Sequence, residues 1–237
     1  MGSFTAERVR LILDEVDPRL LVGTARVTVD LCAEAPETAR RVLDPFAGGS
    51  IIVFALPISE IALWTWYSSG NRRYVFANHM LERAADALSR ALASAGARNL
   101  DLAREAAGHV SLVSLGEWAG LGRRGINNLL LHPEFGSWIQ LHAVITDARI
   151  AHDGAPVTDP CISCLSCVSA CPAEAITTED FFADACVRYV ASFWMPRSRA
   201  RALSQNAYVE CNACIASCPI GRLPSGLDGY EVIDERA

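Results

Sequence analysis

The chain has 237 residues, a formal net charge of −6 and a hydrophobic content of 51%. This length suits one large domain or two smaller ones, and the negative charge argues against a general nucleic-acid binder, which needs basic surface to neutralise phosphates. All 21 basic residues are arginine, which excludes a Walker-type phosphate loop, a Schiff-base lysine and a pyridoxal-phosphate enzyme.

The first 150 residues alternate between strand-like and helix-like patterns. In chain order we expect a strand over residues 20–31, a short helix over 35–43, a strand over 50–58, a long helix over 74–95 and a strand over 138–150. The long helix is the clearest, because apolar side chains including Phe76 and Met80 recur at helical spacing and Gly96 follows as a C-terminal cap. We expect Phe76 and Met80 to lie in the core. The first part is thus an α+β layer structure.

The hydropathy and the N-terminus give no sign of a membrane or of export. No apolar run approaches the ~18 residues of a membrane span. Residues 1–15 are charged early and contain neither a signal-peptide core nor a twin-arginine pair. We therefore expect a cytoplasmic protein without a membrane partner.

A second region begins after a short linker, HDGAPVTDP. Its domain is expected over residues 157–225, with residues 226–237 as a C-terminal tail. Eight of the nine cysteines lie here, and in a cytosolic protein such crowding indicates a metal site rather than disulfides. Because the helices should be short and the apolar core thin, bound inorganic clusters should supply much of the stability. The ninth cysteine, Cys32, is expected to be a small buried hydrophobic residue.

Two related cysteine motifs occupy this region. The first, CISCLSCVSACP, has C-x2-C-x2-C-x3-C-P spacing, and the second, CNACIASCP, repeats its last three cysteines and its proline. In two-cluster ferredoxins the fourth cysteine of such a run ligates the neighbouring cluster, and the lone Cys186 between the motifs completes two sets of four. We assign Cys161, Cys164, Cys167 and Cys218 to one 4Fe-4S cluster, and Cys171, Cys186, Cys211 and Cys214 to the other.

Two questions stay open for this region. Paired C-x2-C units also have the spacing of a zinc site. Two neighbouring clusters form an electron pathway, and a bare ferredoxin would need only the last third of the chain. On grounds of economy, we expect the first 150 residues to hold the electron acceptor.

A glycine-rich segment, LGEWAGLGRRGINNLLLHPEFGSW, precedes the clusters. Gly120, Gly122 and Gly125 form a literal G-x-G-x-x-G. A dinucleotide-binding site needs a strand before the first glycine and a helix after the last. Here four residues intervene after the apolar run, and His132-Pro133 interrupts soon afterwards, so the dinucleotide signal is weak. These glycines could also form only a tight turn.

The glycine-rich segment and the cysteine motifs together resemble the epoxyqueuosine reductase and reductive dehalogenase family. The resemblance is carried by AGLGRRGINNLLLHPEFGSW, CISCLSCVSACPAEAI, Cys186 and CNACIASCPIGR. It implies a nitroreductase-like α/β sandwich layer, residues 1–150, followed by a two-cluster bacterial ferredoxin-like domain, with a base-off cobalamin reduced by the clusters. Carried over to this sequence, the corrin site would be lined by Gly120, Gly122, Gly125, Asn128 and Leu129.

The implied function is a cobalamin-dependent iron–sulfur oxidoreductase that reduces a small substrate. Its electron donor would be a low-potential protein such as ferredoxin or flavodoxin, and nucleic acid is not an expected partner. Two alternatives stay open: a reductive activator or electron-transfer partner of a corrinoid protein, and a flavin-linked ferredoxin-type electron-transfer protein carrying FMN.

The catalytic residue is unassigned. The catalytic aspartate of the epoxyqueuosine reductases has no counterpart in AAGHVSLVSLGEW. The only acid there, Glu117, matches a different family glutamate, and Asp101 lies too far upstream.

Overall fold

The computed structural model describes residues 4–28, 35–69, 72–152, 157–192, 202–204 and 207–227. The chain divides into two units. Unit 1 consists of residues 1–57, 80–123 and 140–159, and unit 2 consists of residues 58–79, 124–139 and 160–237. Residues 58–79 and 124–139 therefore pack with the cysteine-rich region, although the sequence places them within the first 150 residues. Cys32 and most of the expected tail lie outside the described residues.

Unit 1 is built on a four-stranded sheet with the order β1-β2-β8-β5. β1 (Leu21–Arg26) pairs antiparallel with β2 (Ser50–Pro57), and β5 (Asn99–Asp101) pairs antiparallel with β8 (Ile139–Thr146). The expected strand over 50–58 is confirmed, and the strand expected over 138–150 forms as β8 but ends at Thr146. The strand expected over 20–31 ends at Arg26, and its last three residues lie outside the described part.

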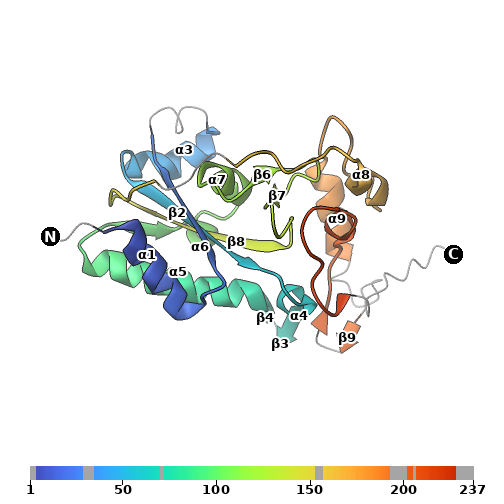
Figure 1. Cartoon of the computed structure of the whole chain (residues 1–237), viewed down its shortest axis with the longest axis horizontal. Coiled ribbons are helices and arrows are strands. Elements are labelled where there is room, and N and C mark those ends of the chain that lie inside the picture. The colour runs from blue at the N-terminus through green and yellow to red at the C-terminus, as the bar shows by residue number, and fades with distance from the viewer. Residues whose placement is uncertain are drawn as a thin grey trace. The chain divides into compact units, whose positions relative to one another are not determined.

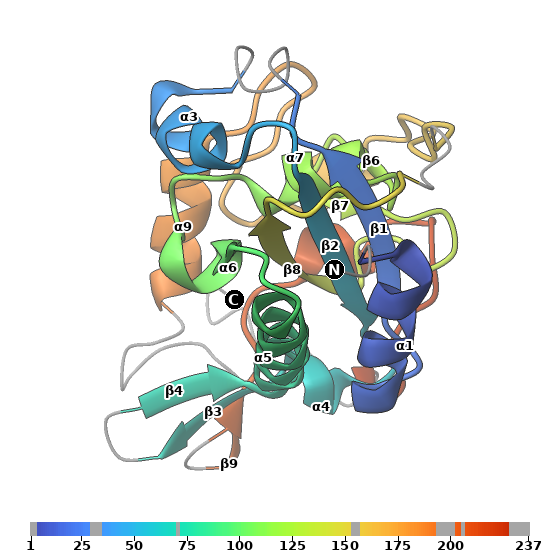
Figure 2. The ribbon, with the colours of Figure 1, turned by 90° about the vertical axis from the view of Figure 1, so that its left-hand side faces the viewer.

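All eight residues of β2 are buried, because helices cover both faces of this sheet. α1 (Ala6–Val16) and α5 (Phe76–Ser94) lie on one side of the strands, and α7 (Leu112–Trp118) lies on the other (Figures 1 and 2). α3 (Glu37–Leu43), the short 3-10 helix η1 (Asp44–Phe46) and α6 (Leu102–Glu105) complete the unit. Unit 1 is thus a mixed α/β layer structure.

The two predicted helices form close to their expected bounds. α3 begins at Glu37, and α5 ends at Ser94 before Gly96, whose φ of 81° terminates the helix. The expectation for Phe76 was wrong: its side chain is 47% exposed, because it is the first residue of α5 and its neighbour Ala77 faces inward instead. Met80 is half-buried.

α1 and α7 were not predicted. Both begin at a hydroxyl side chain that accepts a hydrogen bond from a backbone amide of the first turn. Thr5 accepts from Arg8 (3.2 Å), and Ser111 accepts from Ser114 (3.3 Å). These caps were the missed signals.

Unit 2 contains short elements, as expected from its composition. A small sheet has the order β4-β3-β10-β9. Its strands are β3 (Trp66–Ser69), β4 (Arg72–Val75), β9 (Ala202–Ser204) and β10 (Ala207–Tyr208), with a separate pair β6 (Arg123–Arg124) and β7 (Leu130–Leu131) beginning at the boundary with unit 1. The helices are α4 (Ile61–Trp64), α8 (Ser166–Ala170), α9 (Ala183–Ser192) and α10 (Ala213–Ala216). Within the described residues, no helix has the length and apolarity needed to cross a membrane.

Candidate metal centre

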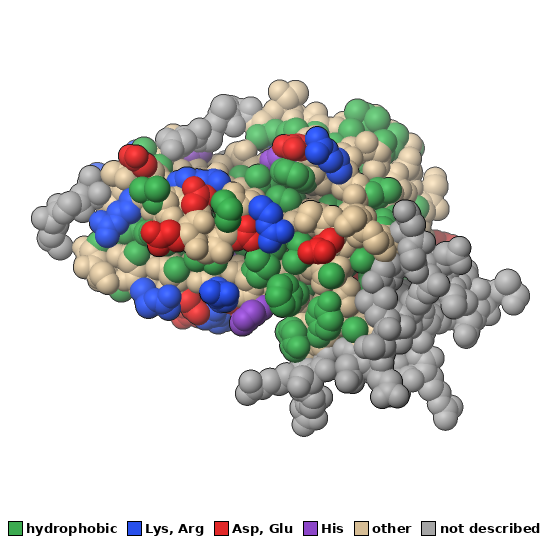
Figure 3. All heavy atoms as spheres, turned by 60° about the horizontal axis from the view of Figure 1, so that its bottom comes forward, with side chains coloured by type: hydrophobic (Ala, Val, Ile, Leu, Met, Phe, Trp, Pro, Cys, Tyr) green, Lys and Arg blue, Asp and Glu red, His purple; other side chains and the backbone are tan. Residues whose placement is uncertain are grey.

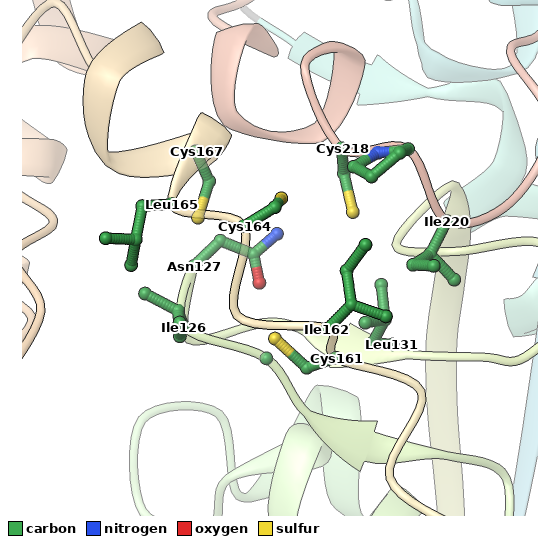
Figure 4. Close-up of a pocket in the computed structure, with 12 residues that line it drawn as sticks. Ile126, Asn127, Leu131, Cys161, Ile162, Cys164, Leu165, Cys167, Cys218 and Ile220 are labelled. Atoms are coloured by element: carbon green, nitrogen blue, oxygen red, sulfur yellow. The ribbon is translucent and has the colours of Figure 1, made fainter.

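Four of the eight clustered thiols line one cavity in unit 2. Cys161 and Cys164 come from the loop before α8, Cys167 from α8 itself, and Cys218 from the turn after α10. Figure 4 shows their sulfur atoms around a common space. Because α8 packs against α10, Cys218 lies beside cysteines that are far from it in the sequence.

The loop that carries the first cysteines has an unusual backbone. Ser163 and Leu165 both have positive φ angles, 53° and 61°. Such left-handed conformations cost non-glycine residues roughly 1–2 kcal/mol each, and they concentrate at ligand-binding sites. Here they turn the loop around the cavity, so that cysteines three residues apart face the same space.

The other four thiols form a second group around α9 and α10. Burial raises the pKa of Cys186 and Cys211, and the charge of Cys171 raises both further. Burial, followed by the charges of Cys211, Cys186 and Cys171, raises the pKa of Cys214 to about 12. These couplings show that the four thiols are electrostatic neighbours.

The two groups adjoin each other. Besides burial, the charges of Cys218 and Cys161 raise the pKa of Cys167, and Cys167 in turn contributes to the raised pKa of Cys214. Cys167 and Cys214 therefore link the two groups.

The charge balance of both groups suits bound cations. Burial, and after it the charges of neighbouring sulfurs, raises the pKa values of Cys167, Cys214 and Cys218. The exposed Cys164 differs, because its hydrogen bond with Ser166 lowers its pKa. Iron ions offset the repulsion between neighbouring thiolates and release the protons on binding. Among the described residues, no three histidine, cysteine, aspartate or glutamate side chains form a group suited to a single metal ion.

The residues expected at a corrin site fall in both units. Gly120 and Gly122 belong to unit 1, just after α7, whereas Gly125, Asn128 and Leu129 belong to unit 2. The latter three share a tight turn, in which Gly125 N–H donates to the Leu129 carbonyl and Asn128 N–H to the Gly125 carbonyl, each at 2.9 Å. Their role toward a corrin stays a prediction.

The dinucleotide alternative lacks both of its required elements. A helix, α7, precedes Gly120 where a strand is needed, and a turn leading to β7 follows Gly125 where a helix is needed.

Sequence reasoning missed that part of the glycine-rich segment lines the thiol cavity. Gly125, Ile126, Asn127 and Leu131 border it together with the cysteines. A pair of glycines holds this segment beside Cys218: a Cβ on Gly136 would lie 2.1 Å from the Ile220 carbonyl oxygen, and one on Gly221 would lie 2.3 Å from the Gly136 nitrogen. Only glycine permits this backbone contact.

The two upstream acids already have partners. Asp101 Oδ1 lies 2.9 Å from His142 Nε2 and accepts a hydrogen bond from the Arg104 amide at 3.0 Å. Although burial acts to raise it, the interactions with His142 and Arg104 hold the pKa of Asp101 below its ordinary value. Glu117 lies 4.0 Å from Arg123.

Residues 160–221 match the sequence family described as a 4Fe-4S double cluster binding domain. An epoxyqueuosine reductase of Listeria monocytogenes is 35% identical over 117 residues, which are 48% of this chain and 31% of that protein. The chain thus spans about a third of the length of this curated relative.

Solved structures extend the likeness to the fold. An epoxyqueuosine reductase with an epoxyqueuosine-modified tRNA-Tyr stem loop matches with a TM-score of 0.63 and 21% identity, covering 90% of this chain and 64% of that one. A reductive dehalogenase, for which a mechanism of B12-dependent dehalogenation is suggested, matches with a TM-score of 0.61 and 16% identity, covering 92% and 32%. The chain therefore carries a 4Fe-4S double cluster binding domain, and its resemblance to the epoxyqueuosine reductases and reductive dehalogenases is confirmed.

Proposed function

We propose that the chain is an iron–sulfur oxidoreductase in which two 4Fe-4S clusters deliver electrons to a base-off cobalamin that reduces a small substrate. The observation that carries the proposal is the grouping of the thiols. We assign Cys161, Cys164, Cys167 and Cys218 to the first cluster, because they share one cavity. We assign Cys171, Cys186, Cys211 and Cys214 to the second on the cysteine spacing, and the mutual effect of these thiols on their pKa values is consistent with their lying close together.

The chain's own residues suit this task. Thiolates are the ligands that iron–sulfur clusters prefer, and when bound the clusters supply one-electron transfer. Apart from the cysteines, the first cavity is lined mainly by apolar side chains, of which Leu131 is buried, whereas Ile162 and Leu165 are exposed at its rim. The apolar side chains around a metal site influence solvent access and the reduction potential. The effect of Cys167 on the pKa of Cys214 is consistent with two clusters that lie close together.

The cobalamin part of the proposal rests on resemblance. One structural neighbour is a reductive dehalogenase whose structure suggests a mechanism for B12-dependent dehalogenation, and the glycine-rich segment resembles the family's segment at the corrin. On this basis we propose a nitroreductase-like layer in unit 1 and a corrin site lined by the glycine residues, Asn128 and Leu129 named above. None of the three relatives named above is described with a flavin, so FMN has no support from them.

The substrate and partners are proposals as well. A low-potential donor such as ferredoxin or flavodoxin fits the clusters, and the reduced thiols of the cytoplasm suit such a site. Nucleic acid needs a direct test, because one structural neighbour holds a tRNA stem loop. The face formed by α1 and α5 intersperses arginines with acids (Figure 3). On α1, Arg10 pairs with Asp14 at 2.8 Å, and Arg104 of α6 pairs with Asp86 of α5 at 3.0 Å, so these arginines are neutralised by acids and do not favour RNA.

Anaerobic reconstitution tests the proposal. We expect about eight irons per chain, as two four-iron clusters require, and a base-off spectrum on titration with cobalamin. Turnover is then assayed with small halogenated or epoxide substrates and, separately, with a tRNA stem loop. A full complement of iron with indifference to every corrinoid contradicts the cobalamin part, and stoichiometric zinc contradicts the cluster part.

A second candidate is a reductive activator that delivers electrons to the corrinoid of a partner protein. It is favoured by the state of the two acids considered above: Asp101 is buried against His142, and Glu117 Oε1 lies 4.0 Å from Arg123 Nε. Cobalt reduction in a stoichiometric complex with a corrinoid protein, without a small-molecule product, selects this function.

A further inference from the structure

Asn127 is the one polar side chain other than cysteine among the residues that line the first thiol cavity. The remaining lining residues are glycine, isoleucine, leucine and proline. Figure 4 shows the Asn127 amide among the four thiols, with its nitrogen directed into the space that they surround. The residue is 4% exposed. A buried amide in an apolar cavity needs hydrogen-bond partners.

Two hydrogen bonds determine which way this amide points. Its Oδ1 accepts a hydrogen bond from the Leu129 backbone N–H at 3.2 Å. Because a backbone N–H can only donate, the amide atom facing it must be the oxygen. Its Nδ2 donates to Ser137 Oγ at 3.3 Å. An amide nitrogen carries two hydrogens, and within the described part of the chain Ser137 is the partner of only one. The second N–H is left to face the cavity.

We propose that Asn127 donates this N–H to a sulfur of the cluster held by Cys161, Cys164, Cys167 and Cys218, and thereby raises the reduction potential of that cluster. The inference rests on the proposed two-cluster function. Reduction adds one negative charge to the cluster, and a donor to its sulfurs stabilises the more negative state more strongly. Hydrogen bonds to sulfur are among the factors that set cluster potentials.

The effect falls on one cluster. Neither Cys171, Cys186, Cys211 nor Cys214 lines this cavity. Asn127 therefore raises the reduction potential of the first cluster and not that of the second, which shifts the distribution of an electron on the pair toward the first. This cluster also lies against Gly125 and Leu131, next to the turn that carries the proposed corrin residues Asn128 and Leu129. This shift would favour electron transfer toward that segment.

The test is an anaerobic redox titration of the reconstituted full-length chain, followed by EPR without cobalamin. At a fixed potential, Asn127→Ala should lower the ratio of reduced to oxidised first cluster about tenfold, which is ~59 mV for a one-electron couple. The second cluster should keep its potential. Two variants serve as controls: Ser137→Ala removes only the brace on Nδ2, and Asn128→Gly removes a neighbouring amide at a position whose φ of 60° glycine tolerates. Neither control variant should change the reduction potential of either cluster.

Each outcome decides the matter. Asn127→Ala with full iron and unchanged potentials overturns the proposal, as does an equal shift in Ser137→Ala. If Asn127→Ala loses the first cluster, Asn127→Asp is measured, because its carboxylate still accepts from the Leu129 amide while lacking the N–H. A more negative potential of the first cluster alone supports the proposal. A wild-type potential in Asn127→Asp, or loss of this cluster in both Asn127 variants, overturns it, because loss in both shows a role in cluster assembly instead. Wild-type protein that binds fewer than two clusters contradicts the proposed function itself.

Discussion

Cys218 is the last cysteine of the second motif. Its substitution by alanine is expected to remove the cluster that the first three cysteines of the first motif also bind. The cavity places Cys218 with Cys161, and each cluster accounts for about four irons. Cys161→Ala and Cys218→Ala should therefore each lower bound iron from about eight to about four per chain. The combined variant should still retain about four, because both substitutions affect the same cluster.

The double variant that combines substitutions at Cys161 and Cys171 should give the opposite result. These two cysteines belong to one motif but to different proposed clusters, so Cys161→Ala combined with Cys171→Ala should bring bound iron close to zero. If each motif held its own cluster, the two double variants would exchange results, and that exchange would refute the grouping. The assay is iron and acid-labile sulfide per chain after anaerobic reconstitution, with EPR of the reduced protein. Cys32→Ala serves as the control and should keep about eight irons.

Three further predictions concern stability. Gly221→Ala forces a Cβ to within 2.3 Å of the Gly136 nitrogen at a φ of 96°, so thermal melting should show a loss of ~2–4 kcal/mol in the free energy of unfolding. The control Gly108→Ala, at a φ of 80° with open space around its Cβ, should lose ~1 kcal/mol. Equal losses in the two variants would contradict the close contact. Because the pKa of Asp101 is lowered in the folded state, its stabilising contribution is complete above the unfolded pKa of ~3.9 and is lost as the pH falls through the folded pKa. Urea unfolding below pH ~4 should therefore show a smaller loss of unfolding free energy in Asp101→Asn than in wild type. Identical pH profiles would refute this. Removing iron with a chelator under oxidising conditions should increase amide hydrogen exchange in residues 160–221 far more than in β2 and β8. Unchanged exchange in residues 160–221 would show that this region folds without metal.

The parts of the molecule that follow from local chemistry were predictable. The cysteine spacing is local, since three ligands from one short loop must reach one cluster, and the buried strand β2 follows from a continuous apolar run. α5 follows from its helical periodicity. The cap residues Thr5 and Ser111 were also local signals for α1 and α7, but short helices with mixed composition give weaker patterns than α5.

The remaining features depend on contacts between distant segments. Nothing in the sequence around Asn127 indicates that it borders the cysteine cavity, because this contact requires Gly136 and Gly221 to bring two loops together. The joining of residues 58–79 to unit 2 has the same cause: β3 pairs with β10, more than a hundred residues later. Periodicity and spacing report on neighbours along the chain, and tertiary pairing is not contained in them.

Asn127 and Asn128 are adjacent in the sequence, and the structure gives them different surroundings that can be separated experimentally. Asn127 lines the thiol cavity, whereas the Asn128 Oδ1 accepts a hydrogen bond from Arg124 at 2.5 Å and its backbone is left-handed. If Asn128 contributes to a corrin site, Asn128→Gly should weaken cobalamin binding about fivefold, the equivalent of one hydrogen bond of ~1 kcal/mol, and should leave both cluster potentials unchanged. Ser137→Ala, which keeps Asn128, should bind cobalamin as wild type does. Wild-type affinity in Asn128→Gly would remove Asn128 from the proposed corrin site, while a shifted cluster potential in the same variant would show that the turn acts on the cluster as a whole rather than through the Asn127 amide.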